Sequence, residues 1–282
     1  MGLIHLAPHL EAHGYTVAII DQFADPEWEK KFEESLEERP VCFGVTSMTG
    51  PQLRQAIGIS RRVKEKDSGI PVVWGGVHTS IRPVEVLENN YVDVVVIGEG
   101  EVTLAELTDA LVEGHSLSEV KGIGYKEGDR QFFTGSRPFL DLAQEPDPAY
   151  HLIDMANYHE DIMGVDHMHL FGSRGCIYDC AYCWDPVVNQ RKHRVTAPGR
   201  IVEQMIRIIR DYGIRGFVFG DDNFFIDMEW AHEVLEGIVR AGLDVHLGKV
   251  FIRADTASRM GKETLDLMVR AGYLEAALAA EA

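Results

Sequence analysis

Short apolar runs alternate with amphipathic stretches along the first part of the chain. Each run is apolar almost without interruption, which is typical of strands covered on both faces in a parallel sheet. Between the runs, a 3.6-residue periodicity predicts helices over about 51–66 and 102–112. This rhythm predicts a doubly wound α/β domain with a flavodoxin-like sheet. The four runs are "TVAIID" (16–21), "CFGVTS" (42–47), "PVVWGG" (71–76) and "DVVVIG" (93–98).

The second part of the chain repeats the alternation after a different kind of segment. A hairpin is predicted within 121–134, turning at Gly128 and Asp129, and a stretch rich in Pro, Asp and Ala follows it as a linker. We therefore divide the chain into a first domain at 1–120, a hairpin and linker at 121–165, and a second domain at 166–282. In the second domain we expect strands at 167–172, 216–220, 248–255 and 273–280, and helices at 198–212, 227–242 and 262–271.

Composition narrows the classes of function. The formal net charge of -18 argues against a nucleic-acid-binding surface, because phosphate binding needs clustered Lys and Arg. No apolar run reaches the length of about eighteen residues that a membrane span needs, and no secretory signal opens the chain. With few cysteines and no disulfide framework, the sequence predicts a cytoplasmic protein.

Three of the four cysteines, Cys176, Cys180 and Cys183, have the spacing C-x3-C-x2-C. A closed zinc site or an ordinary ferredoxin cluster uses four ligands, so three thiolates would leave one iron of a 4Fe-4S cluster open to a substrate. The alternative is a zinc site completed by one of the nearby histidines, at 167, 169 or 193. Cys42, at the start of an apolar run, is interpreted as a packed core thiol.

The stretch "RGCIYDCAYC" (174–183) resembles the signature of the radical S-adenosylmethionine (SAM) superfamily. The resemblance implies a partial (β/α) radical SAM barrel over the second domain, with a 4Fe-4S cluster on the three cysteines and SAM on its open iron. It further implies that Tyr182 lies against the adenine and that SAM cleavage yields a 5'-deoxyadenosyl radical. A small-molecule substrate and an electron donor such as flavodoxin or ferredoxin are implied partners.

The barrel resemblance also assigns residues at the ends of later strands. Gly220, Asp221 and Asp222 end the second barrel strand, where this family contacts the methionine part of SAM, although Asp-Asp-Asn is also an ordinary turn. Arg253 and Asp255 end the third strand and are expected to point toward the mouth of the barrel. Glu281 would be a candidate for the ribose side at the end of the fourth strand.

The first domain resembles the cobalamin-binding domain that precedes the radical barrel in one large subclass, on the stretches "LIHLAPHLEAHGYTVAIID", "VVWGGVHTS" and "VVVIGEGEVTLAEL". Members of that subclass methylate unactivated carbon or phosphorus, or close rings. His78 could be a cobalt ligand or an ordinary turn residue. The alternatives are a radical enzyme whose first domain binds no corrin and a non-catalytic fragment. The expected cobalamin-side residues are Ser47, Thr49, Gly75, Gly76, Gly98, Glu99 and Gly100.

The ends of the sequence suggest that further strands belong to this fold. A flavodoxin-like sheet has its first strand in the middle, whereas this chain opens on what resembles the first helix, so "TVAIID" would lack its central neighbour. The barrel likewise stops within its fourth predicted strand. We therefore expect the chain to be incomplete and inactive by itself.

Overall fold

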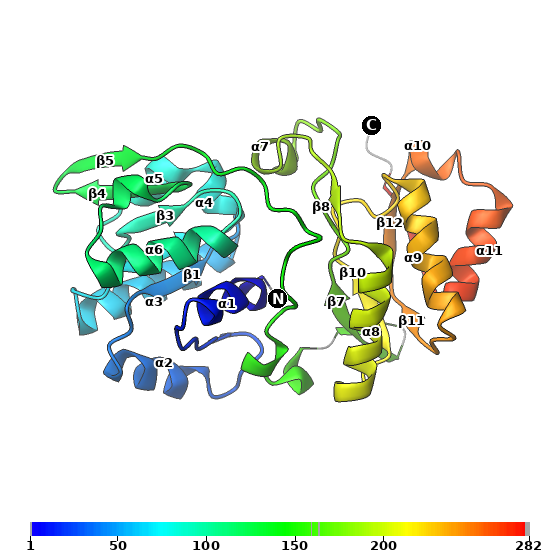
Figure 1. The fold of residues 1–282 in the computed structure, drawn as a ribbon, viewed down its shortest axis with the longest axis horizontal. Helices are drawn as coiled ribbons and strands as arrows, with labels where there is room; N and C mark the ends of the chain where they lie inside the picture. Colours follow the sequence, from blue (N-terminus) through cyan, green and yellow to red (C-terminus); the bar gives the residue numbers. More distant parts are fainter. Residues whose placement is uncertain (1, 159, 163, 280–282) are drawn as a thin grey trace. The chain divides into compact units, whose positions relative to one another are not determined.

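The computed structural model describes residues 2–158, 160–162 and 164–279, so Glu281 lies outside the described residues (Figure 1). The chain divides into two compact units. The first consists of Met1–Leu140 with Pro146–Asp154, and the second of Asp141–Glu145 with Met155–Ala282. The segment expected as a linker is therefore shared between the units, and the predicted hairpin belongs to the first.

The first unit contains a five-stranded sheet in the order β1-β2-β3-β4-β5. The first three strands are parallel, and the hairpin of β4 and β5 continues the sheet in antiparallel pairing. The strands are β1 (Phe43–Thr46), β2 (Val72–Gly75), β3 (Val94–Val96), β4 (Ile123–Glu127) and β5 (Arg130–Phe133). The helices are α1 (Leu3–Ala12), α2 (Trp28–Glu37), α3 (Gln52–Lys66), α4 (Val77–Ile81), α5 (Pro83–Leu87) and α6 (Glu101–Glu113), with 3-10 turns η1 (Leu117–Glu119) and η2 (Tyr150–Leu152).

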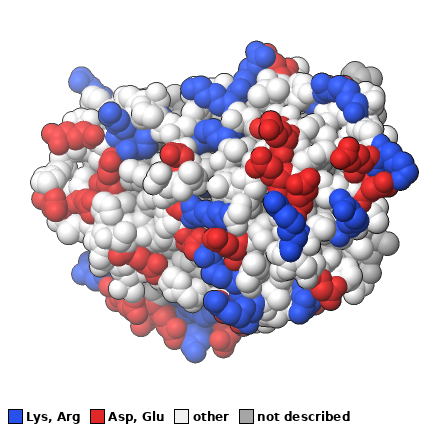
Figure 2. All heavy atoms as spheres, turned by 45° about the vertical axis from the view of Figure 1, so that its right-hand side comes forward, with Lys and Arg blue, Asp and Glu red and all other residues white. Residues whose placement is uncertain are grey.

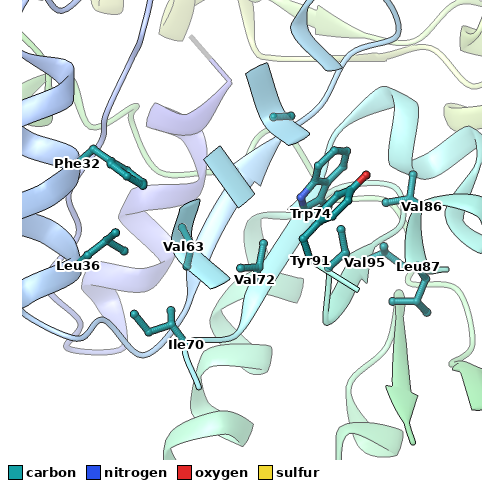
Figure 3. Close-up of a cluster of buried hydrophobic side chains, with 12 residues drawn as sticks. Phe32, Leu36, Val63, Ile70, Val72, Trp74, Val86, Leu87, Tyr91 and Val95 are labelled. Atoms are coloured by element: carbon teal, nitrogen blue, oxygen red, sulfur yellow. The ribbon is translucent and has the colours of Figure 1, made fainter. Parts of the chain in front are cut away.

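Neighbouring residues of the same strand enter different cores in this unit. Val72 and Trp74 of β2 pack in a cluster with side chains of α2 and α3, including Phe32 (Figure 3). Val73, between them, packs in a second cluster with Leu107 of α6. A strand with apolar side chains on both faces buries both, which explains why these runs are continuously apolar. The doubly wound α/β prediction is confirmed for this unit.

The strand expected at 16–21 was a wrong prediction. These residues are not paired with any strand in the described structure. β1 pairs with β2 along one edge, and the described residues place no strand at its other edge. An apolar run becomes a strand only when a neighbouring backbone takes up its hydrogen bonds. The sequence pattern also missed α2, where Phe32 and Leu36 form the buried face of an otherwise charged helix.

The second unit has a four-stranded sheet in the order β11-β10-β7-β6, in which β7, β10 and β11 are parallel and β6 is antiparallel. A parallel pair, β12 and β13, and a short antiparallel pair, β8 and β9, complete its strands. The strands are β6 (Glu160–Ile162), β7 (Val165–Leu170), β8 (Ser173–Arg174), β9 (Arg194–Val195), β10 (Gly216–Phe219), β11 (His246–Leu247), β12 (Val250–Arg253) and β13 (Ala276–Ala279). The helices are α7 (Asp185–Val188), α8 (Pro198–Tyr212), α9 (Met228–Arg240), α10 (Ala254–Ala257) and α11 (Lys262–Ala271), with the 3-10 turn η3 (Met155–Asn157).

The predicted helices of the second unit are found in place. Figure 1 shows α9 between α8 and α11, beside the strands. The carboxylate of Asp227 accepts a hydrogen bond from Trp230 N over 3.0 Å and so caps α9, as the sequence predicted. The predicted strand at 248–255 is shorter, starting at Val250, and a parallel bridge between Leu247 and Tyr273 connects β11 with the chain leading into β13.

The surface carries both signs of charge. On the face drawn in Figure 2, acidic and basic side chains are interspersed. None of the described helices combines the length and the apolar composition that crossing a membrane would require.

Candidate functional site

The three cysteines lie in the loop between β8 and α7, which follows the carboxyl end of the central strand β7. Gly175 makes the turn into this loop with a φ of +86°. A Cβ atom at this position would lie 2.2 Å from the backbone oxygen of Lys192 and 2.9 Å from Cβ of Asn189. Glycine is therefore required here both for its backbone conformation and for the space it leaves.

Asp185, directly after the cysteine motif, joins the two ends of the loop. Its carboxylate is buried and accepts a hydrogen bond from Cys176 N over 2.8 Å. The Asn189 amide donates to the same carboxylate, and Asp185 N lies 3.5 Å from the Cys183 sulfur. Sequence reasoning missed this residue; the available signal was an acidic residue followed by proline at the start of a helix.

The thiols themselves are partly accessible and form no disulfide. Burial raises the pKa of Cys176, and the carboxylates of Asp185 and Asp222 and the neighbouring Cys183 raise it further. Among the described residues, no three side chains of Cys, His, Asp or Glu converge closely enough to enclose a metal ion. The cysteines thus share one loop without yet having the geometry of a ligand set.

The surroundings of the thiols are compatible with an iron-sulfur cluster. N–H groups approach two of the sulfurs, Asp185 N toward Cys183 and Arg253 Nη1 toward Cys180, and such donors are usual around cluster thiolates. None of the three histidines considered for zinc converges with the cysteines among the described residues. His169 lies near Glu160, whereas Nε2 of His167 and of His193 has no hydrogen-bond partner among these residues.

The two aspartates at the end of β10 contact the segment that leads into the cysteine loop. Asp221 accepts hydrogen bonds from Gly172 N and from the Ser173 hydroxyl, and Asp222 accepts one from Gly175 N over 2.9 Å. Burial raises the pKa of Asp221 to about 6. Burial, reinforced by the Asp185 carboxylate, raises the pKa of Asp222 to about 6, although part of the residue is open to solvent.

Other residues expected around SAM have varied surroundings. Tyr182 is 71% exposed. Gly220 is closely packed, because a Cβ at this position would lie 2.6 Å from the Phe171 ring. Arg253 is half-buried and packs over Tyr178. Asn223, next to the two aspartates, is buried, and both polar atoms of its amide lack a hydrogen-bond partner among the described residues. A buried amide without a partner is costly, and such groups mark positions where a ligand or water completes the structure.

In the first unit, hydrogen bonds connect the three loops that follow the parallel strands. Ser47 N donates to Gly75 O over 2.8 Å, and His78 N donates to Ser47 O. Ser80, which sequence reasoning did not select, accepts a hydrogen bond from Gly98 N over 2.9 Å and donates one to Gly76 O. The structure therefore brings these sequence-selected loops together at the carboxyl edge of the sheet.

Several of the residues expected to contact cobalamin have structural partners. Ser47 is buried and bonds to Gly75 O and Thr79. Gly76 has a φ of +98°, and a Cβ there would lie 2.7 Å from Ser47 O. The Glu99 carboxylate accepts a hydrogen bond from Leu140 N.

The remaining residues of this group lie in more open surroundings. A Cβ at Gly75 would meet only Val96, at 3.8 Å, and one at Gly100 would lie 3.1 Å from Leu6. Gly98 has a φ of +81° with open space in front of it, and Thr49 is exposed. The Thr49 hydroxyl lies 3.0 Å from Nδ1 of His78, whose pKa is lowered by burial.

Two family models match this chain in the order of its two units. The B12 binding domain matches residues 1–108, and the radical SAM superfamily matches residues 170–282. An uncharacterized methyltransferase of Pyrococcus horikoshii is 30% identical over 248 residues, covering 87% of this chain and 53% of that protein. The anaerobic magnesium-protoporphyrin IX monomethyl ester cyclase of Cereibacter sphaeroides is 27% identical, covering 99% of this chain and 46% of the cyclase.

Solved structures share the fold. The radical SAM methyltransferase TsrM of Kitasatospora setae, solved with cobalamin and a [4Fe-4S] cluster bound, superposes with a TM-score of 0.80 at 22% identity. The match covers 99% of this chain and 57% of TsrM. The cobalamin-dependent SAM radical enzyme OxsB gives a TM-score of 0.78 at 19% identity, over 100% of this chain and 41% of OxsB.

The two relatives and the two solved proteins are all longer than this chain, which spans about half of their length. The two matched domains occur in the order that the sequence motifs indicated. The chain belongs to the radical SAM superfamily, in the subclass in which a B12-binding domain precedes the radical SAM domain.

Proposed function

We propose that this chain forms the cobalamin-binding and radical-generating parts of an enzyme that methylates a small molecule, or closes a ring in it, at an unactivated carbon. In this proposal Cys176, Cys180 and Cys183 hold a 4Fe-4S cluster, and a protein such as flavodoxin or ferredoxin supplies electrons. The reaction is a proposal for the whole protein, because the relatives that support it are about twice as long.

The proposal rests on the support of the cysteine loop by two carboxylates, the buried Asp185 and the exposed Asp222. Asp185 and Asp222 accept backbone N–H groups at Cys176 and Gly175, so they fix the backbone where the loop begins. Fixing the backbone leaves the three thiols free to act as ligands, since none is used by a disulfide. Burying a carboxylate is costly unless hydrogen bonds compensate for the lost water, so the use of the buried Asp185 to hold the loop supports a function in binding.

Residues of the second unit have distinct roles in this proposal. When bound, the cluster supplies the electron that cleaves SAM. Asn223 would offer its unpartnered amide to the methionine part of SAM at the end of β10, and the exposed Tyr182 ring would cover the adenine. Asp221 would serve mainly to hold Gly172 and Ser173, because its oxygens already accept their hydrogen bonds.

The cluster is tested by anaerobic reconstitution with iron and sulfide. Replacing Cys176, Cys180 or Cys183 by Ala should abolish cluster absorption and reduce bound iron to background. The matched control is Cys42→Ser, which removes the fourth thiol of the chain, partly buried against the second hydrophobic cluster of the first unit. Stoichiometric zinc without sulfide in the reconstituted protein would contradict the assignment.

The cobalamin site is better tested at Gly98 than at Gly76. A side chain at Gly76 would clash with Ser47 O. A Gly76 variant that failed to retain cobalamin would therefore not distinguish a lost binding site from misfolding. A side chain at Gly98 meets no atom within 4 Å, and asparagine tolerates its positive φ. We expect Gly98→Asn to lower cobalamin retention after desalting while iron content stays normal. Gly14→Asn is the control, because Gly14 has a similar φ of +85° and equally open space.

The second candidate is a radical SAM enzyme whose first unit binds no corrin. Ser47 forms its hydrogen bonds within the protein, to Gly75 O and Thr79, and Gly76 is needed because a Cβ there would clash with Ser47 O. The presence of these two residues is therefore explained without a bound corrin, which favours the second candidate. Protein produced with cobalamin supplied, then desalted, separates the two. Corrin absorption in the protein fraction supports the first candidate, and its absence from a well-folded sample supports the second.

A further inference from the structure

The guanidinium of Arg253 lies between the end of β12 and the cysteine loop. Its Cζ is 3.7 Å from the centroid of the Tyr178 ring, and its Nε donates to Asp255 over 3.0 Å. The Tyr178 hydroxyl lies 3.4 Å from the other oxygen of the same carboxylate. Arg253 is therefore fixed on its face by an aromatic ring and on its edge by an ion pair.

The third contact of this guanidinium is a cysteine sulfur. Arg253 Nη1 lies 3.8 Å from Sγ of Cys180, within the range of an N–H···S hydrogen bond. Tyr178 stands between Cys176 and Cys180 in sequence, so the ring that holds Arg253 belongs to the loop that carries the thiols. The contact thus joins residues that are more than seventy positions apart in the chain.

We propose that Arg253 is a positioning residue that donates a hydrogen bond to the Cys180 thiolate and raises the reduction potential of the cluster held there. The inference rests on the proposed function, because it needs a cluster on Cys180. Reduction adds one negative charge to the cluster, and a positive charge and an N–H donor at a ligand sulfur stabilise that more negative state. With Nε on Asp255 and Nη1 on Cys180, this role is more specific than the position at the mouth of the barrel expected from the sequence.

The test is the midpoint potential of the reconstituted cluster, measured by redox titration without SAM, together with the EPR spectrum of the reduced cluster. Arg253→Met should make one-electron reduction at least tenfold less favourable, which corresponds to a potential about 59 mV lower. Arg253→Lys keeps the charge but loses the planar donor, so we expect a smaller shift in the same direction. Arg259→Met is the matched control: Arg259 also bonds to Asp255, through its backbone oxygen, and has no sulfur contact among those described.

The outcomes separate this inference from the proposed function. If the wild-type protein takes up no iron and sulfide, the proposed function fails. If Arg253→Met holds a full cluster at the wild-type potential, or shifts it no more than Arg259→Met does, only the role of Arg253 is overturned. If no Arg253 variant assembles a cluster, the double variant Tyr178→Leu, Asp255→Ala is titrated instead, because it removes both the ring and the ion pair that hold the guanidinium beside Cys180. An unchanged potential in that variant would also overturn the role.

Discussion

Replacing Gly175 by alanine adds one methyl group at the turn into the cysteine loop and should remove the cluster. The new Cβ would start 2.2 Å from Lys192 O, whereas ordinary van der Waals contact begins near 3.4 Å, so one side must move by 3.4 − 2.2 = 1.2 Å. The same Cβ would press on Asn189 at 2.9 Å. Asn189 holds Asp185, and Asp185 holds Cys176 N, so the displacement reaches the first ligand.

The energetic cost of this substitution has two parts. A left-handed backbone conformation costs an alanine roughly 1–2 kcal/mol. Forcing a methyl group into a closely packed site costs about 1–3 kcal/mol more. The sum, about 2–5 kcal/mol, is a large fraction of the stability of a typical domain, which is about 5–15 kcal/mol.

Urea unfolding and the iron and sulfide content after reconstitution test this prediction together. Gly175→Ala should shift the unfolding midpoint to lower urea and lose most of the bound iron. Gly199→Ala is the matched control, because Gly199 lies exposed in α8, has no positive φ, and would place its new Cβ with no atom within 4 Å. A Gly175→Ala protein with the midpoint and iron content of wild type would refute the reasoning.

Three further predictions concern the supporting structure. Asp221 has its pKa raised from 3.8 to about 6, so its stabilising contribution is complete below pH 3.8 and is lost as the pH rises through 6. Urea titrations at several pH values should therefore show that the unfolding free energy of wild type, relative to that of Asp221→Asn, falls by about 2–3 kcal/mol between about pH 4 and pH 7. A difference between the two proteins that does not change with pH would count against the raised pKa of Asp221. Gly76→Ala should destabilise the first unit by about 2–5 kcal/mol, because its Cβ meets Ser47 O at a φ of +98°, and an unchanged urea midpoint would exclude that clash. Gly58→Ala, exposed within α3 with open space around it, should instead stabilise the protein by about 0.5–1 kcal/mol in the same assay, and a loss of stability would contradict this.

Local sequence determined the elements whose signals lie within a few residues. The helix at Pro198–Tyr212 was predicted at its observed ends, because an apolar periodicity coincides with a proline in the first turn and Gly213, with a φ of 71°, at the end. The buried strands β2 and β3 followed from runs of valine that fit only a sheet covered on both faces. The cysteine spacing likewise indicated the superfamily, because it lies within one short loop.

Tertiary structure decided what depends on partners distant in the chain. "TVAIID" has the composition of a strand, yet a strand forms only where another backbone offers its hydrogen bonds, and no spacing within the run reveals that neighbour. Asp221 and Asp222 reach the cysteine loop only because β10 pairs in parallel with β7, which brings the two strand ends to the same edge of the sheet. The contact of Arg253 with Cys180 has the same origin, since the fold alone sets the direction of a side chain at the end of a strand.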